Sequence, residues 1–295
     1  MDVLITDKQV IKYLVEKYKL EINDHISLSK VLFAVSKQER KMKKKVSQHD
    51  VIWEHILLNR GFDSTKDIQY ITADDIKNSK DTWAGKKSQF EPRILCKQDS
   101  DKRRPAIFKK LGIYILSVKN GTYALVKENI YVILKKGNCP TTKIVQKHNS
   151  SILSLGNSET TMLDKLRYNG IIEEIIDEKI LYGPILGGRH RCHFSTLLGK
   201  NEINISGSQF ETDAVYETEK SICIIEAKSI NSDSFNIRQL YYPFRYIYDH
   251  VGAKKKIFCL FIYKDKSNVI HIHKFIWNNP EIMLDIKCIG YWRYI

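Results

Sequence analysis

Residues 209–228 read QFETDAVYETEKSICIIEAK, and this stretch decides the fold of the C-terminal half of the chain. It contains two runs of β-forming residues joined by a short polar turn at 218–220. Asp213 lies within the first run. The second run is apolar on both faces from 222 to 225, which is typical of a central strand covered on both sides.

Two charged residues end the second run. Glu226 and Lys228 are two positions apart, so on a strand their side chains share one face. Burying an acid and an amine at the end of a covered strand is costly unless each has a partner. That cost indicates a functional site at this end of the strand.

The segments around this stretch predict a mixed sheet. A helix should begin at Asn157 or Ser158 and end at Gly170, because a capping residue precedes its apolar stripe and a glycine follows it. The order helix, three strands, helix, two strands predicts a mixed α/β sheet layer. The further elements that we expect are strands at 189–198, 203–217, 221–229, Ile257–Lys264 and Val269–Trp277, and a helix at 233–249.

The N-terminal half has shorter elements and longer loops. Residues 1–35 carry apolar residues at helical spacing, and a basic run follows between Lys37 and Lys45. Asn120-Gly121 joins two β-forming runs within 112–126, which predicts a β-hairpin. We place a domain boundary at 148, which divides the chain into 1–148 and 149–295.

The composition narrows the class of protein. The 295 residues include 48 Lys and Arg against 34 Asp and Glu, a net charge of +14, which favours a polyanionic partner such as nucleic acid. No apolar run approaches the roughly 18 residues of a membrane span, and no secretion signal is apparent. The six cysteines form no C-x-x-C pair. We therefore expect a cytoplasmic protein with reduced thiols, no membrane association and no zinc site.

The pattern of Asp213 and Glu226-Ala227-Lys228 resembles that of the PD-(D/E)xK nuclease superfamily. Thr212 lies where the family's proline would be. Other segments resemble a group of type II restriction endonucleases, so that the resemblance covers most of the chain and is most specific in the C-terminal half. These segments are Phe90–Leu95, the 112–126 hairpin, Gly187-Gly188-Arg189-His190-Arg191, and FNIRQLYYP at 235–243.

This resemblance implies a fold and an activity. The fold would be α+β or α/β, with a restriction-endonuclease-like core in which helices flank a mixed central sheet, and with a mostly helical N-terminal region that includes the hairpin. The activity would be Mg²⁺-dependent, sequence-specific cleavage of double-stranded DNA that leaves 5′-phosphates. Residues 149–295 would be catalytic, and residues 1–148 would serve DNA recognition or dimerisation. A homodimer and a separate cognate DNA methyltransferase are also implied, in a bacterial or archaeal cell, with no nucleotide cofactor.

The chemistry requires these residue types. Asp213 and Glu226, with the main-chain carbonyl of Ala227, would bind one or two Mg²⁺ ions, which Mn²⁺ could replace. Lys228 would orient or deprotonate the attacking water, or stabilise charge on the phosphate. Glu159 lies on the apolar stripe of the preceding helix and is a further catalytic candidate. The alternative is that Glu159 only stabilises the helix N-terminus.

Several residues are candidates for binding DNA. Arg189, His190 and Arg191 follow a Gly-Gly turn and suggest a phosphate clamp, although an exposed turn would look the same. We expect His271 and His273 to lie on the exposed face of an edge strand, and the tyrosines at 241 and 242 to pack in the core. The other DNA-binding candidates are Arg238 and Gln239 on the helix after the Lys228 strand, and Arg103 and Arg104 in the polar segment 78–106.

Two alternative functions stay open. One is a structure-specific or exonucleolytic DNA repair nuclease with the same core. The other is a non-catalytic, basic DNA-binding protein in which the E-x-K pattern is coincidental. A binding protein should leave DNA length unchanged in Mg²⁺, and salt should weaken its affinity equally for all sequences.

Overall fold

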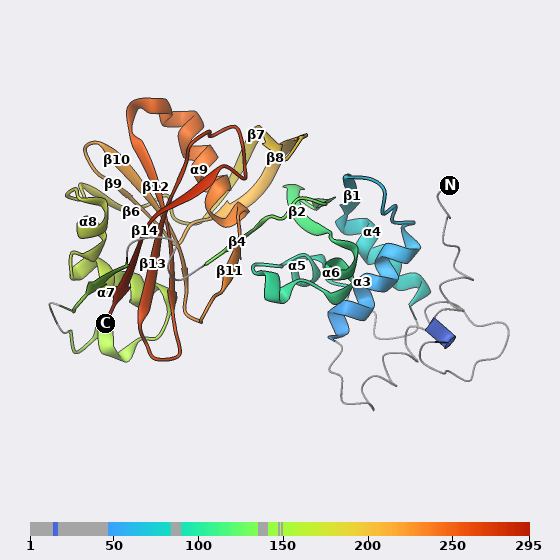
Figure 1. The fold of residues 1–295 in the computed structure, drawn as a ribbon, viewed down its shortest axis with the longest axis horizontal. Helices are drawn as coiled ribbons and strands as arrows, with labels where there is room; N and C mark the ends of the chain where they lie inside the picture. Colours follow the sequence, from blue (N-terminus) through green and yellow to red (C-terminus); the bar gives the residue numbers. More distant parts are fainter. Residues whose placement is uncertain (1–13, 17–46, 84–89, 135–140, 147, 149) are drawn as a thin grey trace. The chain divides into compact units, whose positions relative to one another are not determined.

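The computed structural model of the chain describes residues 14–16, 47–83, 90–134, 141–146, 148 and 150–295 (Figure 1). These residues form an α+β protein with helices and several sheets. The chain divides into two compact units. Unit 1 comprises Met1–Gln98, Arg103–Ser117 and Gly121–Asn129, and unit 2 comprises Asp99–Lys102, Val118–Asn120 and Ile130–Ile295.

Unit 1 has its own small core. Helix α3 (Gln48–Asn59) begins with a capping box, and its Trp53 packs edge-on against Phe108 with ring centroids 4.7 Å apart. The predicted hairpin is confirmed: Gly121 has a φ of 72°, the left-handed region in which an Asn-Gly turn places its glycine. A three-stranded sheet of order β1-β3-β2 completes the unit, with β1 (Ile68–Thr72), β2 (Tyr114–Lys119), β3 (Thr122–Val126) and the short helices α4 (Ala73–Asn78), α5 (Pro92–Leu95) and α6 (Ala106–Leu111).

The helices expected in residues 1–35 fall almost wholly outside the described residues. The basic run from Lys37 to Lys45 lies wholly outside the described residues, and so does Cys139.

A seven-stranded mixed sheet organises unit 2. Its order is β5-β14-β13-β12-β10-β9-β6. Strand β10 is buried along its length up to Lys228, and it pairs antiparallel with β9 and parallel with β12, so the prediction of a central, covered strand is confirmed. The strands are β5 (Thr141–Ile144), β6 (Tyr182–Ile185), β9 (Ala214–Glu217), β10 (Ser221–Lys228), β12 (Lys256–Lys264), β13 (Ile270–Trp277) and β14 (Ile286–Tyr294).

Helices cover both faces of this sheet (Figure 1). Helices α7 (Glu159–Tyr168) and α8 (Ile171–Ile176) share an apolar core with Cys223, Ile225 and Ala227 of β10. Side chains alternate along a strand, so Glu226 and Lys228 belong to the opposite face, where α9 (Arg238–Val251) lies. The helix predicted from 157 to 170 is confirmed as α7, with Ser158 as its N-cap.

A separate two-stranded ribbon packs on α9. It consists of β7 (Arg189–Leu198) and β8 (Asn201–Glu211), which pair antiparallel. Phe194 of β7 contacts both Tyr241 and Tyr242 edge-on, with ring centroids 5.7 and 5.5 Å apart. Both tyrosines are fully buried, so the expectation that they pack in the core is confirmed.

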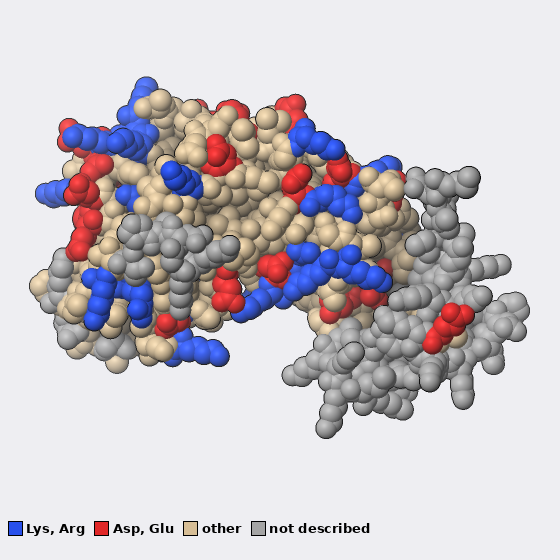
Figure 2. Space-filling model, in the orientation of Figure 1, with Lys and Arg blue, Asp and Glu red and all other residues tan. Residues whose placement is uncertain are grey.

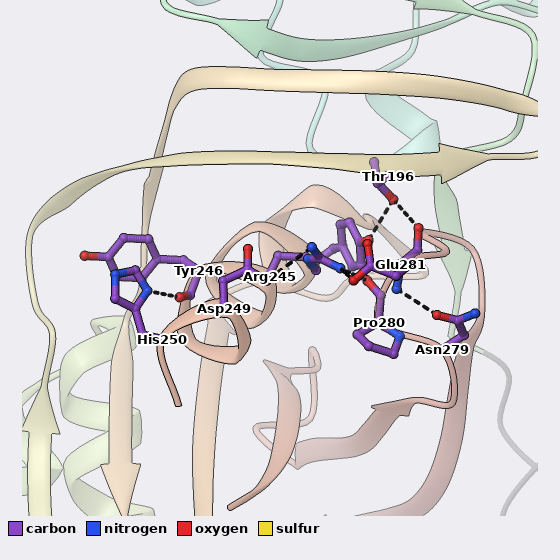
Figure 3. Close-up of polar contacts among 9 residues, drawn as sticks. Thr196, Arg245, Tyr246, Asp249, His250, Asn279, Pro280 and Glu281 are labelled. Carbon is purple, nitrogen blue, oxygen red and sulfur yellow. Dashed lines mark hydrogen bonds and ion pairs between the residues drawn. The ribbon is translucent and has the colours of Figure 1, made fainter. Parts of the chain in front are cut away.

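A polar network fixes this ribbon to α9 (Figure 3). The Arg245 side chain is only 6% exposed, and its Nη1 donates to the carbonyl oxygen of Pro280 at 2.7 Å. The same guanidinium pairs with Glu281 at 2.6 Å and with Asp249 at 3.2 Å. The Thr196 hydroxyl is 2.7 Å from the Tyr241 hydroxyl and donates to the Glu281 carbonyl oxygen at 3.0 Å. The ribbon, α9 and the turn at 279–281 are therefore held together.

Some expected elements were wrong in extent. The predicted strand 203–217 is two strands, because the chain leaves β7 after Glu211 and pairs with β10 from Ala214. The predicted helix 233–249 begins only at Arg238, because Ser234–Asn236 forms strand β11 and pairs with β4 (Tyr131–Ile133).

The two histidines of β13 correct a further expectation. His271 and His273 are buried, being 1% and 2% exposed, and they do not lie on an exposed edge. The reason is β14, which the sequence analysis did not predict and which pairs along the whole of β13. His271 is 2.6 Å from the Tyr291 hydroxyl of β14, and the His273 ring stacks on the same tyrosine.

Two short strands, at 131–133 and 141–144, pair with the C-terminal part of the chain. Strand β4 pairs with β11, and β5 pairs parallel with β14. The five described cysteines are free thiols. None of the helices that the structure describes combines the length and the apolar character needed to cross a bilayer.

We predict that Arg245→Ala destabilises the protein by about 2 kcal/mol, because it removes charge-assisted hydrogen bonds from a buried guanidinium. Glu281→Gln should cost less than about 1 kcal/mol, because the Glu281 side chain is 60% exposed and the amide keeps an acceptor. Urea denaturation of the two variants measures the difference. Equal losses would show that the ion pair, and not the buried hydrogen bond, holds this junction.

Candidate active site

The end of β10 carries a buried pair of opposite charges. The Lys228 ammonium pairs with the Glu226 carboxylate and also donates to the Ala227 carbonyl oxygen at 3.0 Å. Burial raises the pKa of Glu226 to about 7, although Lys228 opposes the shift. Burial alone would lower the pKa of Lys228, but its interactions with Glu226 and Asp213 outweigh that effect and raise it. Lys228 is therefore protonated at neutral pH.

Asp213 is held opposite Ala227 on the neighbouring chain segment. Its backbone N–H donates to the Ile225 carbonyl oxygen at 3.2 Å, and its Oδ2 accepts from the Ala227 N–H at 2.7 Å. Burial raises the pKa of Asp213, and the nearby carboxylates of Glu159 and Glu211 raise it further, while the Ala227 N–H and Lys228 lower it. The structure thus brings Asp213, Glu226 and Lys228 together.

Glu159 reaches the same end of β10 from α7. It is the first residue of the helix, after the N-cap Ser158, and its Oε1 accepts from the Ser229 N–H at 3.0 Å. Its charge also acts on both Asp213 and Lys228. Glu159 is therefore both the first residue of α7 and a member of the acidic cluster. A role in stabilising the helix N-terminus and a role in the candidate site do not exclude each other.

Gln239 reaches the cluster from α9. Its Nε2 donates to Glu226 Oε1 at 2.6 Å. Its own Oε1 is buried and has no hydrogen-bond partner among the described residues. The Gln239 amide group therefore holds the Glu226 carboxylate in place, and its own oxygen remains available as an acceptor beside that carboxylate.

Sequence reasoning did not identify one acidic residue that acts on this cluster. Asp99 lies far away in sequence, in a polar loop without a motif, but its charge also raises the pKa of Glu226. Its carbonyl oxygen accepts from the Asn236 N–H at 2.9 Å, which attaches this segment just before α9. Only the folded chain shows this proximity.

The donors at this site suit a hard divalent cation. In the described part of the chain, no three His, Cys, Asp or Glu side chains form a group that could bind a metal by themselves. The candidate donors are two carboxylates, the Ala227 carbonyl and the unpartnered Gln239 oxygen. Mg²⁺ accepts such a set, because it prefers oxygen, needs few protein ligands and retains water. The residues present therefore fit the expected ion.

Of the candidate DNA-binding residues, Gln239 belongs to this cluster, and the others lie outside it. Arg189 pairs with Glu211 at 2.6 Å, and the His190 ring lies beside Phe210 and Tyr246. Arg191 is exposed on the ribbon. Arg238 begins α9, and Arg103 and Arg104 belong to unit 1, where the Arg104 guanidinium lies 4.1 Å from the Tyr114 ring centroid.

On the face that Figure 2 shows, Lys and Arg side chains gather in several groups with Asp and Glu beside them. Lys and Arg are interspersed with Asp and Glu over the described residues of that face. The net charge of +14 is therefore not a guide to the position of a binding surface there.

The fold and the cluster define an α+β protein with a buried acid–lysine site at the end of a central strand. The chain belongs to a family described as a domain of unknown function (DUF6997), whose model matches residues 126–295. A second domain of unknown function (DUF6996) matches residues 50–125. No curated protein and no solved structure matches the chain.

The raised pKa of Glu226 predicts a pH-dependent stability. The folded chain keeps the Glu226 proton up to about pH 7, whereas the unfolded chain loses it near the ordinary value of 4.5. The folded state binds more protons between these values, so this group lowers the free energy of unfolding as the pH rises through them. Relative to Glu226→Gln, the wild type should lose up to roughly 3 kcal/mol across this range.

Urea denaturation of both proteins in EDTA, from pH 4.5 to 8, measures this difference. Glu219→Gln, which removes a carboxyl from the exposed turn before β10, is the control for loss of a negative charge alone. Parallel curves for the wild type and Glu226→Gln would contradict a buried, proton-retaining Glu226.

Proposed function

We propose that the chain is a Mg²⁺-dependent, sequence-specific DNA endonuclease of the type II restriction kind. One observation carries the proposal: Asp213, Glu226 and Lys228, from two neighbouring segments of one sheet, gather at the end of β10. Two carboxylates can bind a divalent cation and a protonated lysine can stabilise charge on a phosphate, so these groups suit phosphodiester hydrolysis.

The arrangement of elements supports a restriction-endonuclease-like core. Helix α7 precedes the antiparallel pair β9 and β10, α9 follows, and β12 returns parallel to β10. The sheet is mixed and has helices on both faces. The acidic residues come from the start of α7 (Glu159), the segment before β9 (Asp213) and the end of β10 (Glu226). The sequence resemblance predicts acidic residues in the same order along the chain.

The residues suggest separate roles. Asp213, Glu226 and the Ala227 carbonyl would hold Mg²⁺, which polarises the phosphate and lowers the pKa of a bound water when present. Lys228 keeps its proton, so it would orient the water and donate to a phosphate oxygen, a role that its raised pKa favours over that of a base. Gln239 would position Glu226, and Glu159 would hold the backbone after Lys228 in place through Ser229.

The proposed partners follow from the substrate. Double-stranded DNA with a palindromic site would require a homodimer, with one active site for each strand. Residues of the N-terminal half would contribute recognition or dimerisation. A cognate DNA methyltransferase would protect the host DNA, and the enzyme would work in the cytoplasm of a bacterium or archaeon.

Lys228→Ala should lower the rate of cleavage by at least about 10²-fold, because it removes the cation that acts on the scissile phosphate. DNA binding in EDTA should persist. Gel analysis of methylation-free phage and plasmid DNA with Mg²⁺ or EDTA measures cleavage. The control is Lys266→Ala, which removes an exposed lysine from the turn between β12 and β13 and should cut like the wild type.

Discrete bands from the wild type, present only with Mg²⁺, support the proposal. A smear would instead indicate a repair or non-specific nuclease. Unchanged DNA with retained binding would indicate a non-catalytic DNA-binding protein. Full-rate cutting by Lys228→Ala would show that the active site has been assigned to the wrong residues.

A further inference from the structure

The β7–β8 ribbon has two faces of different character. Along both strands, buried and exposed residues alternate, and the buried ones pack toward α9. The face turned away from the core, which we call the outer face, is polar apart from Leu197. Its central residues form three cross-strand positions: Arg191 opposite Gln209, His193 opposite Ser206, and Ser195 opposite Asn204.

The side chains of these six residues have no hydrogen bond or ion pair with any residue that the structure describes. Arg189 and Glu211 differ, because they pair with each other at the base of the ribbon. Arg191 is therefore the uncompensated cation among the described residues of the outer face. Apart from the Arg189–Glu211 pair, the outer face has, among these described residues, one free cation, Arg191, one free carboxylate, Glu202 opposite Leu197, and several neutral donors and acceptors. Such a face suits recognition of base edges better than general attraction to phosphates.

The ribbon is fixed relative to the acidic cluster. Thr196 (Figure 3) and Phe194 attach it to α9. The same helix carries Gln239, which bonds to Glu226. At its other end, β8 runs into Asp213 after one residue, and the Thr212 hydroxyl donates to the Leu186 carbonyl oxygen at 2.9 Å. At about 3.3 Å per residue, Gln209 lies roughly 13 Å along the chain from Asp213, the length of about four base-pair steps.

We propose that the outer face of the ribbon enters the major groove of duplex DNA and reads base edges beside the bond that is cut. This inference rests on the proposed function and names the residues that would set its specificity. The major groove is wide enough for a two-stranded ribbon. Arg191 has the fork that recognises guanine, and Gln209 and Asn204 have amides that pair with the adenine edge.

Selection of binding sites from a pool of random duplexes, in EDTA so that no DNA is cut, tests the proposal. Arg191→Ala and Gln209→Ala should each lose roughly 5- to 100-fold in affinity for the selected site and relax the preference at a base pair. Gln209→Glu should change the preferred base instead of weakening all binding, because a carboxylate accepts from cytosine. Lys266→Ala is the control and should select the wild-type site.

The outcomes separate this inference from the proposed function. An unchanged preference in the Arg191 and Gln209 variants, in a wild type that cuts specifically with Mg²⁺, overturns the ribbon assignment alone. Relaxed preference without Mg²⁺-dependent cutting supports the ribbon and overturns the nuclease. Absence of duplex binding by the wild type overturns both. An altered oligomeric state with an unchanged base preference would assign the outer face to contacts between copies and overturn the proposal.

Discussion

The charge cluster around the buried Glu226, at the end of β10, is the constraint on which the rest of unit 2 depends. Glu226, Asp213 and Glu159 lie close enough to influence one another or the same lysine, and Lys228 is the cation among them. Burial raises the pKa of both Glu226 and Asp213. Such a cluster destabilises the fold, and under the proposed function a bound divalent cation would offset this cost.

The surrounding elements hold this cluster in place. Strand β10 lies inside the sheet and pairs on both sides, so its end has a fixed position. Helix α7 approaches from one face and supplies Glu159, while α9 approaches from the other and supplies Gln239. Helix α9 also bears the buried Arg245, which connects it to the β7–β8 ribbon and the turn at 279–281. A rigid helix therefore links the proposed catalytic groups to the proposed reading surface.

Local patterns predicted the parts of this structure that local physics determines. The apolar run before Glu226 predicted β10, and the capping residue before Glu159 predicted α7. Contacts between distant segments could not be predicted in this way. The burial of His271 depends on pairing with β14, and the proximity of Asp99 to Glu226 depends on a loop contact. The division of 203–217 into two strands likewise depends on a change of pairing partner, which no periodicity encodes.

Direct titration with Mn²⁺ tests the central claim, that the cluster at the end of β10 is a divalent-cation site. Electron paramagnetic resonance of free Mn²⁺ at pH 8 measures how many ions each chain binds. We predict saturable binding by the wild type, weakening as the pH falls below about 7 because protons compete for the carboxylates, and loss of this binding in Asp213→Asn. Equal binding by the wild type and Asp213→Asn, or none by either, would contradict the account.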